Sequence, residues 1–325
     1  MGRPGTRRWI GRVAVQGVVF VALVVGGAVP AFAAKPTGTG HGGGGGGGGG
    51  GTATATGNDI SYPQCGSSFP SAPAFGIVGV NGGVASDLNP CLGPSSSYPN
   101  YTESELYWAV AASVGGTTQP KASLYVNTGD PGNVYNGTVI GDWPTTSVSG
   151  DPYGSCTTTT VTLTSGTYLV GQNSDGCAWQ YGYNMATQDA GWLSAAASAI
   201  DGQESSVSVA GTASSYPWWL DVETGNTWQS DTTMNVADLQ GMIAGLTAAG
   251  VNAATIGVYS TSSQWNTITG GTSSASGSLY GIANWIPGAR GLSGAEANCT
   301  QASFTGGKVV LTQWFGHPVD GDYAC

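Results

Sequence analysis

Basic residues and histidine are scarce in this sequence, and their scarcity excludes several kinds of chemistry. The 325 residues include eight Lys and Arg and two His, against 18 Asp and Glu, for a net charge of −10. Binding to nucleic acid needs clustered Lys and Arg, so we expect no nucleic-acid partner. A Ser–His–Asp triad would have to use His317, and no GxSxG elbow accompanies any serine. We therefore interpret His317 as a loop residue.

Motifs for metals and nucleotides are also missing. The sequence has no HExxH, no CxxC and no GxxxxGK[ST], and no GxGxxG between an expected strand and helix. We expect neither a metal nor a cofactor.

Long apolar runs are absent after residue 34. Before it, four arginines precede an apolar run from Val13 to about Val29, followed by the small residues AFAA (31–34). This pattern predicts a signal peptide over 1–34, and the pair Arg7-Arg8 leaves Sec and twin-arginine export both open. We expect a secreted, extracellular protein, free or associated with the cell wall, with no membrane span once the signal is removed.

A glycine-rich segment over 35–57 follows, with ten consecutive glycines, and predicts a flexible linker. Residues 58–325 are then expected to form one domain. Removal of 1–34 would leave four basic residues against 18 acidic ones, a net charge of −14. Charge alone then disfavours adhesion to polyanionic wall polymers.

Six cysteines are expected to form disulfides, because an even number in an exported chain is typical of a disulfide framework. Six cysteines allow 15 pairings, and we favour pairing of sequence neighbours. The favoured pairs are Cys65–Cys91, Cys156–Cys177 and Cys299–Cys325.

Short apolar runs alternate with helical patterns, which predicts a parallel sheet covered by helices. The expected strands are 59–62, 75–80, 122–127, 218–222, 255–259, 279–285 and 308–314, and the expected helices are 103–114, 185–200 and 236–250. For the last helix we predict Asn235 as the N-cap and Gly250 just past the end. The pattern breaks over 133–183, where residues 157–170 predict a β-hairpin. The predicted fold is an irregular α/β barrel of the TIM type with a hairpin excursion and disulfides.

Carboxylates stand at the ends of the expected strands. Asp59 opens the first, Asp221 and Glu223 end the fourth, and Asp320 follows the last. Residues i and i+2 of a strand point to the same side, so Asp221 and Glu223 should project together. The carboxyl ends of barrel strands form the active face, and clustered carboxyls raise at least one pKa. Glycoside hydrolysis uses one protonated and one ionised carboxyl.

Aromatic residues are plentiful, with 11 Trp and 14 Tyr. Sugar rings stack on such side chains. We interpret Trp218 and Trp219 as core residues, one facing the barrel interior and one the helices. Trp228, Trp285 and Trp314 are equally consistent with a core or a saccharide cleft.

The ordered motifs resemble the family 25 glycoside hydrolases, which are lysozyme-type N-acetylmuramidases with an irregular α/β barrel. The motifs are DIS (59–61), FGIVGVNGG (75–83), WWLDVE (218–223), IGVYST (256–261), IANW (282–285) and LTQW…VDGDY (311–323). The resemblance implies Glu223 as proton donor and Asp221 as the residue that orients the substrate's acetamido group. Asp59 and Asp320 would set the local field. Substrate would contact Trp285, Trp314, Tyr259 and Gln313.

The sequence also departs from the family pattern. LYVNTGDPG (124–132) stands where the family has a YHF-like motif, and residues 133–183 have no counterpart. Two functions therefore remain open. The first is a secreted glycosidase, acting as a monomer on peptidoglycan or a related amino-sugar polymer. The second is a non-catalytic barrel that binds wall saccharide or a protein. A structural surface protein is a third class, but it does not explain the positions of the acids.

Overall fold

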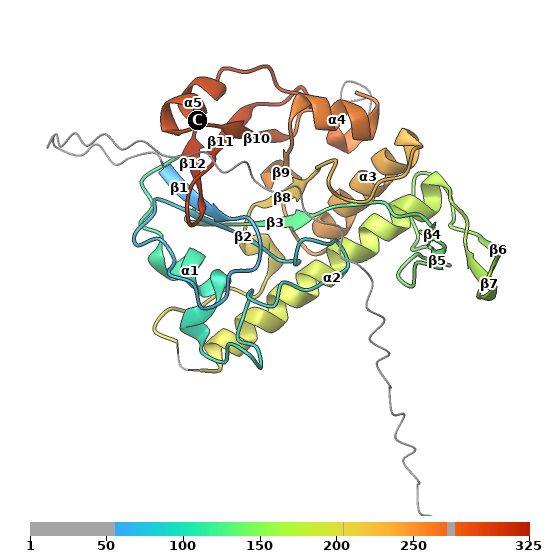
Figure 1. Cartoon of the computed structure of the whole chain (residues 1–325), viewed down its shortest axis with the longest axis horizontal. Coiled ribbons are helices and arrows are strands. Elements are labelled where there is room, and N and C mark those ends of the chain that lie inside the picture. Colours follow the sequence, from blue (N-terminus) through green and yellow to red (C-terminus); the bar gives the residue numbers. More distant parts are fainter. Residues whose placement is uncertain (1–55, 204, 272–276) are drawn as a thin grey trace, which may run out of the picture. The chain divides into compact units, whose positions relative to one another are not determined.

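Eight strands close into a barrel in this computed structural model, which describes residues 56–203, 205–271 and 277–325 (Figure 1). Their order around the barrel is β1-β12-β11-β10-β9-β8-β3-β2. The strands are β1 (Thr56–Ile60), β2 (Gly76–Gly79), β3 (Ala122–Asn127), β8 (Trp218–Asp221), β9 (Ile256–Tyr259), β10 (Ala283–Ala289), β11 (Val309–Trp314) and β12 (Asp320–Ala324). The predicted α/β barrel is confirmed. The predicted signal peptide, and the predicted linker up to residue 55, lie outside the described residues.

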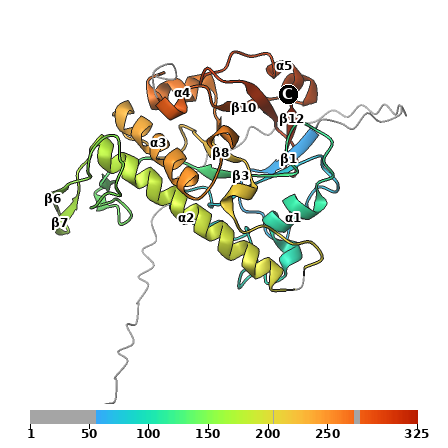
Figure 2. The same cartoon turned by 180° about the vertical axis from the view of Figure 1, so that it is seen from behind.

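Helices follow most of the parallel strands, as the alternating sequence pattern predicts. They are α1 (Glu105–Ala112), α2 (Asp175–Asp201), α3 (Thr232–Ala248), α4 (Ser262–Thr269) and α5 (Leu292–Asn298), with short 3-10 turns η1 (Tyr101–Glu103), η2 (Ala213–Ser215), η3 (Ala253–Thr255) and η5 (Gly277–Leu279). Viewed from the opposite side, α2 and α3 again lie side by side (Figure 2). These helices cover the outward side chains of the strands.

Alternation along the strands divides the core into two parts. Trp218 points outward into the layer between strands and helices, whereas Trp219 points into the barrel with Phe75 and Trp285. Both Trp218 and Trp219 are buried. The predicted core role of this pair, with one residue on each side of the sheet, is confirmed.

The barrel is closed by a strand that the sequence pattern did not reveal. Asp320 lies in β12, which runs antiparallel to both β11 and β1, instead of in a loop after the last strand. The prediction of an all-parallel sheet is therefore wrong at this position. The sequence of β12, DGDYA, lacks the apolar residues that mark the other strands. Pairing on both sides supplies the stability that local propensity does not.

Several helix boundaries also differ from the predictions. Helix α3 begins earlier than expected, and Asp231 is its N-cap, accepting a hydrogen bond from the Thr233 N–H. Asn235 lies inside the helix, where its amide donates to the backbone oxygens of Gln229 and Ile268. Helix α2 begins ten residues before the predicted start. Gly250 follows the end of α3 with a positive φ of 93°, as predicted.

The predicted hairpin excursion is present between β3 and α2. It contains β4 (Val134–Tyr135) paired with β5 (Thr138–Val139), and β6 (Thr158–Leu163) paired with β7 (Gly166–Gly171). In Figures 1 and 2 the β6–β7 hairpin lies away from the barrel strands, near the beginning of α2. The excursion therefore adds a surface to the barrel without joining its sheet.

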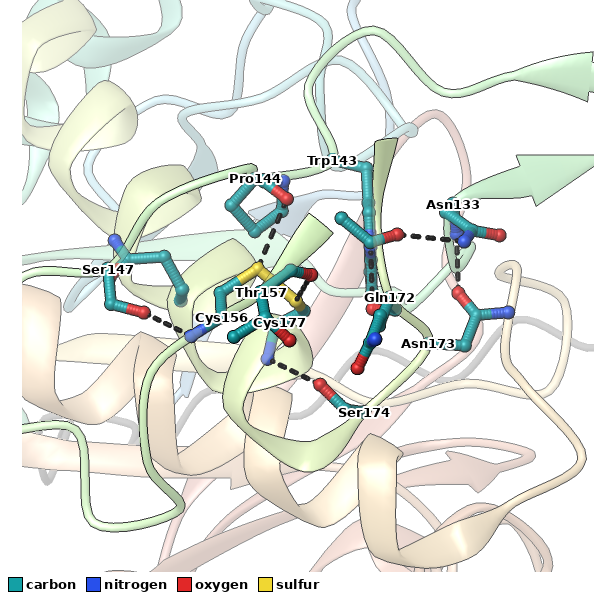
Figure 3. The surroundings of a disulfide bond; sticks show 12 residues. Asn133, Trp143, Pro144, Ser147, Cys156, Thr157, Gln172, Asn173, Ser174 and Cys177 are labelled. Carbon is teal, nitrogen blue, oxygen red and sulfur yellow. Dashed lines mark hydrogen bonds between the residues drawn. A yellow bond between two sulfur atoms is a disulfide. The ribbon is translucent and has the colours of Figure 1, made fainter. Parts of the chain in front are cut away.

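A disulfide fixes the base of this excursion (Figure 3). Cys177, in the first turn of α2, is bonded to Cys156, and the Ser174 hydroxyl caps that turn by accepting from the Cys177 N–H. The indole of Trp143 donates to the Gln172 carbonyl oxygen beside it. The other two disulfides are Cys65–Cys91 and Cys299–Cys325, so the favoured pairing is confirmed in all three cases.

Glycines allow α2 and α3 to approach each other closely. A methyl group at Gly241 of α3 would overlap the backbone carbonyl of Trp179 in α2, and one at Gly182 would overlap that of Asp238. We expect Gly241→Ala to lower the free energy of unfolding by about 1–3 kcal/mol, because backbone atoms cannot move aside as a side chain can. Denaturant unfolding measures this loss.

The neighbouring helix α2 provides a matched control. Gly191 of α2 has open space around its Cα, so Gly191→Ala should be neutral or raise stability by roughly 0.5–1 kcal/mol through helix propensity. If both substitutions had the same effect, close packing of the two helices would not be the reason that Gly241 is required.

Candidate active site

One pocket at the carboxyl ends of the strands contains most of the predicted site residues. Six of the eight predicted catalytic or substrate-binding residues line it, together with Ser61 and Tyr125. These six are Asp59, Asp221, Glu223, Tyr259, Trp285 and Gln313. The lining includes three carboxyls and no basic side chain. The position of acids at strand ends therefore does bring them together.

Asp221 and Glu223 reach the pocket from the end of β8. Asp221 is buried. The Asn127 amide of β3 has two possible orientations, and in the one that gives both its oxygen and its nitrogen a partner, the nitrogen donates to Asp221 Oδ2 at 3.1 Å. Glu223 is half-buried, and its Oε1 accepts from Gln264 at 3.4 Å. Burial raises the pKa of both carboxyls, and the negative charges of Glu223 and Asp59 raise the pKa of Asp221 further. The pair therefore tends to share a proton.

Asp59 lies at the floor of the pocket, held by side chains from β9 and β11. The Gln313 amide donates to Asp59 Oδ1 at 3.0 Å, and its oxygen accepts from the Tyr259 hydroxyl at 3.0 Å. Burial, together with the charge of Asp320, raises the pKa of Asp59 to about 7. Both ends of the Gln313 amide are thus engaged inside the barrel. That geometry favours a positioning role for Gln313 over the substrate contact implied by the resemblance.

Two predicted site residues are not part of the pocket lining. Asp320 stands beside it, where its carboxylate accepts from the Ser61 hydroxyl at 2.9 Å and from the Gly316 N–H at 2.8 Å. Trp314 is half-buried, and its indole lies across Gly321 of β12. Trp285 does line the pocket but is buried, with its ring packed against Trp219 and Tyr259. It forms part of the core as well as of the pocket.

Sequence reasoning noted Asp322 beside Asp320 but assigned no role to it or to Tyr125, two buried groups around Asp59. Asp322 lies beside Asp59 and the Trp285 indole, two residues after Asp320 on the same face of β12. Tyr125 lines the pocket from β3 and donates its hydroxyl proton to the Ile60 carbonyl oxygen at 2.9 Å. The period-2 spacing of Asp320 and Asp322 was a usable signal, but it required β12 to be identified as a strand.

The loop after β3 connects the pocket to the excursion. The Thr128 hydroxyl donates to the Asp221 carbonyl oxygen at 2.7 Å, and Asp130 accepts from the Gln229 amide at 2.7 Å. Asn133 then donates its amide to the Gly171 carbonyl oxygen at 2.8 Å. This loop couples the end of β8 to the excursion over residues 133–183.

Buried carboxyls make the stability of the fold depend on pH. Burial raises the pKa values of Asp59, Glu105 and Asp130 to about 7, and it raises those of further acids well above their ordinary values. The further acids are Asp189, Asp221, Asp238 and Asp322. Ordinary Asp and Glu in the unfolded chain titrate near pH 4. The native state therefore holds protons that the unfolded chain has lost.

Stability should consequently be greatest near pH 4 and decline as the pH rises through 7. We expect a lower melting temperature at pH 8 than at pH 5, measured by near-UV circular dichroism at constant ionic strength. A melting temperature that rises over this interval would mean that these carboxyls are ionised in the native state.

In residues 56–203, 205–271 and 277–325, no group of three or more His, Cys, Asp or Glu side chains could hold a metal ion. Within the same part of the chain, no helix has the length and hydropathy required to cross a bilayer.

Known proteins resemble this chain around the end of β8. The family model described as "Lysozyme-like protein 1" matches residues 201–285, which include Asp221, Glu223, Tyr259 and Trp285. A 67-residue stretch is 43% identical to the "Probable GH family 25 lysozyme 4" of Dictyostelium discoideum. The chain resembles the family 25 lysozymes. The resemblance stated from the motifs is thereby confirmed.

The extent of the likeness is limited. The stretch shared with the Dictyostelium lysozyme covers 21% of this chain and 30% of that protein. A crystal structure of the bacterial lysozyme from Streptomyces coelicolor aligns over 84% of this chain and 93% of its own length, with 14% identity and a TM-score of 0.38. The match to the family model covers the segment that carries the Asp221–Glu223 pair.

Proposed function

We propose that this protein is a secreted glycosidase that hydrolyses peptidoglycan or a related amino-sugar polymer. The observation that carries the proposal is the convergence of Asp59, Asp221 and Glu223 in one pocket. In addition, the lysozyme-like segment includes the two acids at the end of β8. The three disulfides favour an extracellular protein, because such bonds persist in oxidising environments.

Glu223 is assigned the role of general acid. It is the least buried of the three pocket acids, so its carboxyl is accessible from the pocket opening. Burial raises its pKa, which favours the protonated form that a general acid needs. Glu223 gives this proton to the glycosidic oxygen as the bond from that oxygen to the anomeric carbon breaks.

Asp221 is assigned to the substrate's acetamido group. When the shared proton is on Glu223, Asp221 is ionised and its charge is stabilised by the Asn127 amide. The ionised carboxylate accepts a hydrogen bond from the acetamido N–H and turns the acetamido oxygen toward the anomeric carbon, to which this oxygen bonds as the leaving group departs. A water molecule then attacks the anomeric carbon, breaks that bond and returns a proton to Glu223. Asp59 and Asp320 contribute negative potential where positive charge develops on the sugar ring.

A digest of purified peptidoglycan tests the function. We expect new reducing ends to accumulate with time in the presence of the protein. The alternative, a non-catalytic barrel, predicts that the protein sediments with the insoluble wall but releases no reducing ends. A chitin-type oligosaccharide run in parallel separates an N-acetylmuramidase from an enzyme for another amino-sugar polymer.

A further inference from the structure

Asp322 is the buried carboxyl of the pocket floor that the proposed reaction does not use. It is fully buried in β12, and its backbone is paired with Gln313 of β11 and Gly57 of β1. The Asp59 carboxyl and the Trp285 indole lie next to its side chain. Within the described residues no hydrogen bond of good geometry reaches either Asp322 oxygen, although the Trp285 indole N–H faces this carboxyl.

Two adjacent carboxylates cannot hydrogen-bond to each other, because both offer only acceptors. A single proton between Asp322 and Asp59 changes this, since one carboxyl then donates to the other. Without that proton, two negative charges would be buried side by side, which is the most costly arrangement for a pair of acids. The geometry therefore requires that the pair hold at least one proton.

The surroundings decide which carboxyl keeps the proton. Asp59 Oδ1 accepts from the Gln313 amide at 3.0 Å, and such a donor stabilises an ionised carboxylate. Asp322 faces one N–H donor, the Trp285 indole, which lowers its pKa less than burial raises it, and its apolar neighbours on the inner face of the barrel include Leu311 and Ala324. The proton is thus favoured on Asp322.

The other ionisable groups facing this pair are acids or tyrosines. Tyr125 and Tyr259 have pKa values raised by burial and by neighbouring carboxylates, so they stay neutral. The full set comprises Asp320 of β12, Asp221 and Glu223 at the end of β8, Tyr125 of β3 and Tyr259 of β9. Each negative charge in this set further disfavours ionisation of Asp322.

We propose that Asp322 is a positioning residue that retains a proton and donates it in a hydrogen bond to Asp59, which stabilises the ionised form of the Asp59 carboxyl at the pocket floor. Asp59 in turn raises the pKa of Asp221 through its charge, which helps the Asp221–Glu223 pair to keep the catalytic proton. This last consequence rests on the proposed glycosidase function. The protonation of Asp322 does not.

The charge of the folded protein at pH 7 tests the protonation without any assay of activity. If Asp322 is protonated, Asp322→Asn replaces one neutral donor by another, and capillary electrophoresis should show no change in net charge. Asp87→Asn, at an exposed aspartate, is the matched control and should shift the charge by about one unit. A one-unit shift for Asp322→Asn would overturn the proposal.

A second variant with a neutral donor keeps the test decisive if Asp322→Asn does not fold. Asp322→Ser is measured in the same way, and each variant is used only if its near-UV circular dichroism matches the wild type. If Asp322→Asn fails to fold, an unchanged charge in Asp322→Ser supports the proposal, and a one-unit shift contradicts it.

Activity then tests the positioning role. Asp322→Ala should lower reducing-end release by about tenfold to 100-fold, the range expected for a lost hydrogen bond to a charged group, whereas Asp322→Asn should restore most of it. Equal losses in both folded variants would show that a donor to Asp59 is not what the reaction needs. If the wild type releases no reducing ends, the proposed function fails, while the charge measurement still decides the state of Asp322.

Discussion

Glu223→Gln should lower the rate of reducing-end release from peptidoglycan by about 10²- to 10⁴-fold, the usual contribution of a positioned general acid. Glutamine keeps the size of the side chain and its contact with Gln264, but it has no proton to give to the leaving oxygen. The pocket should remain intact, so binding to the insoluble wall should be retained. Rates are measured from the initial linear phase of the digest.

A surface substitution of the same chemistry controls for this variant. Glu296 lies exposed on α5, and Glu296→Gln should leave the rate unchanged. Both variants should match the wild type in melting temperature at pH 5. Wild-type rates in Glu223→Gln would remove Glu223 from the mechanism and favour the non-catalytic barrel.

The strand pattern of the sequence was sufficient to predict where the two acids at the end of β8 lie. Asp221 and Glu223 follow three buried residues, Trp218 to Leu220, and period-2 alternation alone directs both acids to one side of the strand. Asp59 was expected to open the first strand, but β1 begins at Thr56, so Asp59 lies near its carboxyl end instead. The barrel itself follows from short apolar runs that alternate with helical patterns. Local sequence was sufficient wherever the strand is buried on both faces.

Local sequence was insufficient to predict the elements and side-chain roles that depend on tertiary contacts. The first part of α2 reads DGCAWQYGYN, with two glycines that disfavour a helix, yet Gly182 is required there because the α3 backbone approaches it. Strand β12 carries two acids and a glycine in five residues. Its partner β1 is distant in sequence, and an irregular turn separates it from its other partner, β11. The role of Gln313, which links Asp59 to Tyr259, depends on contacts that no sequence spacing reveals.

The strand that escaped detection is also the one that a disulfide tethers. Cys325 follows β12 directly, and its partner Cys299 follows α5. Opening this bond in a Cys299→Ser/Cys325→Ser variant should lower the free energy of unfolding by about 3.5 kcal/mol. This is the chain-entropy value for a closed loop of that length. Denaturant unfolding measures the loss.

The chain contains a matched control for that experiment. Cys65 and Cys91 are also separated by 26 residues, so chain entropy predicts the same loss for Cys65→Ser/Cys91→Ser. The two variants should differ in the native state. The first releases the end of β12, whereas the second releases a loop between β1 and α1.

Hydrogen exchange separates these two effects. We expect faster exchange of the β12 amides of Asp322 and Ala324 in the Cys299→Ser/Cys325→Ser variant only, because β12 is short and its polar residues contribute little apolar burial. Loosening of β12 should also reduce glycosidase activity below that of the other disulfide variant, since Asp320 and Asp322 both contact the surroundings of Asp59. Equal stability losses with unchanged β12 exchange would mean that pairing with β1 and β11 closes the barrel without help from the disulfide.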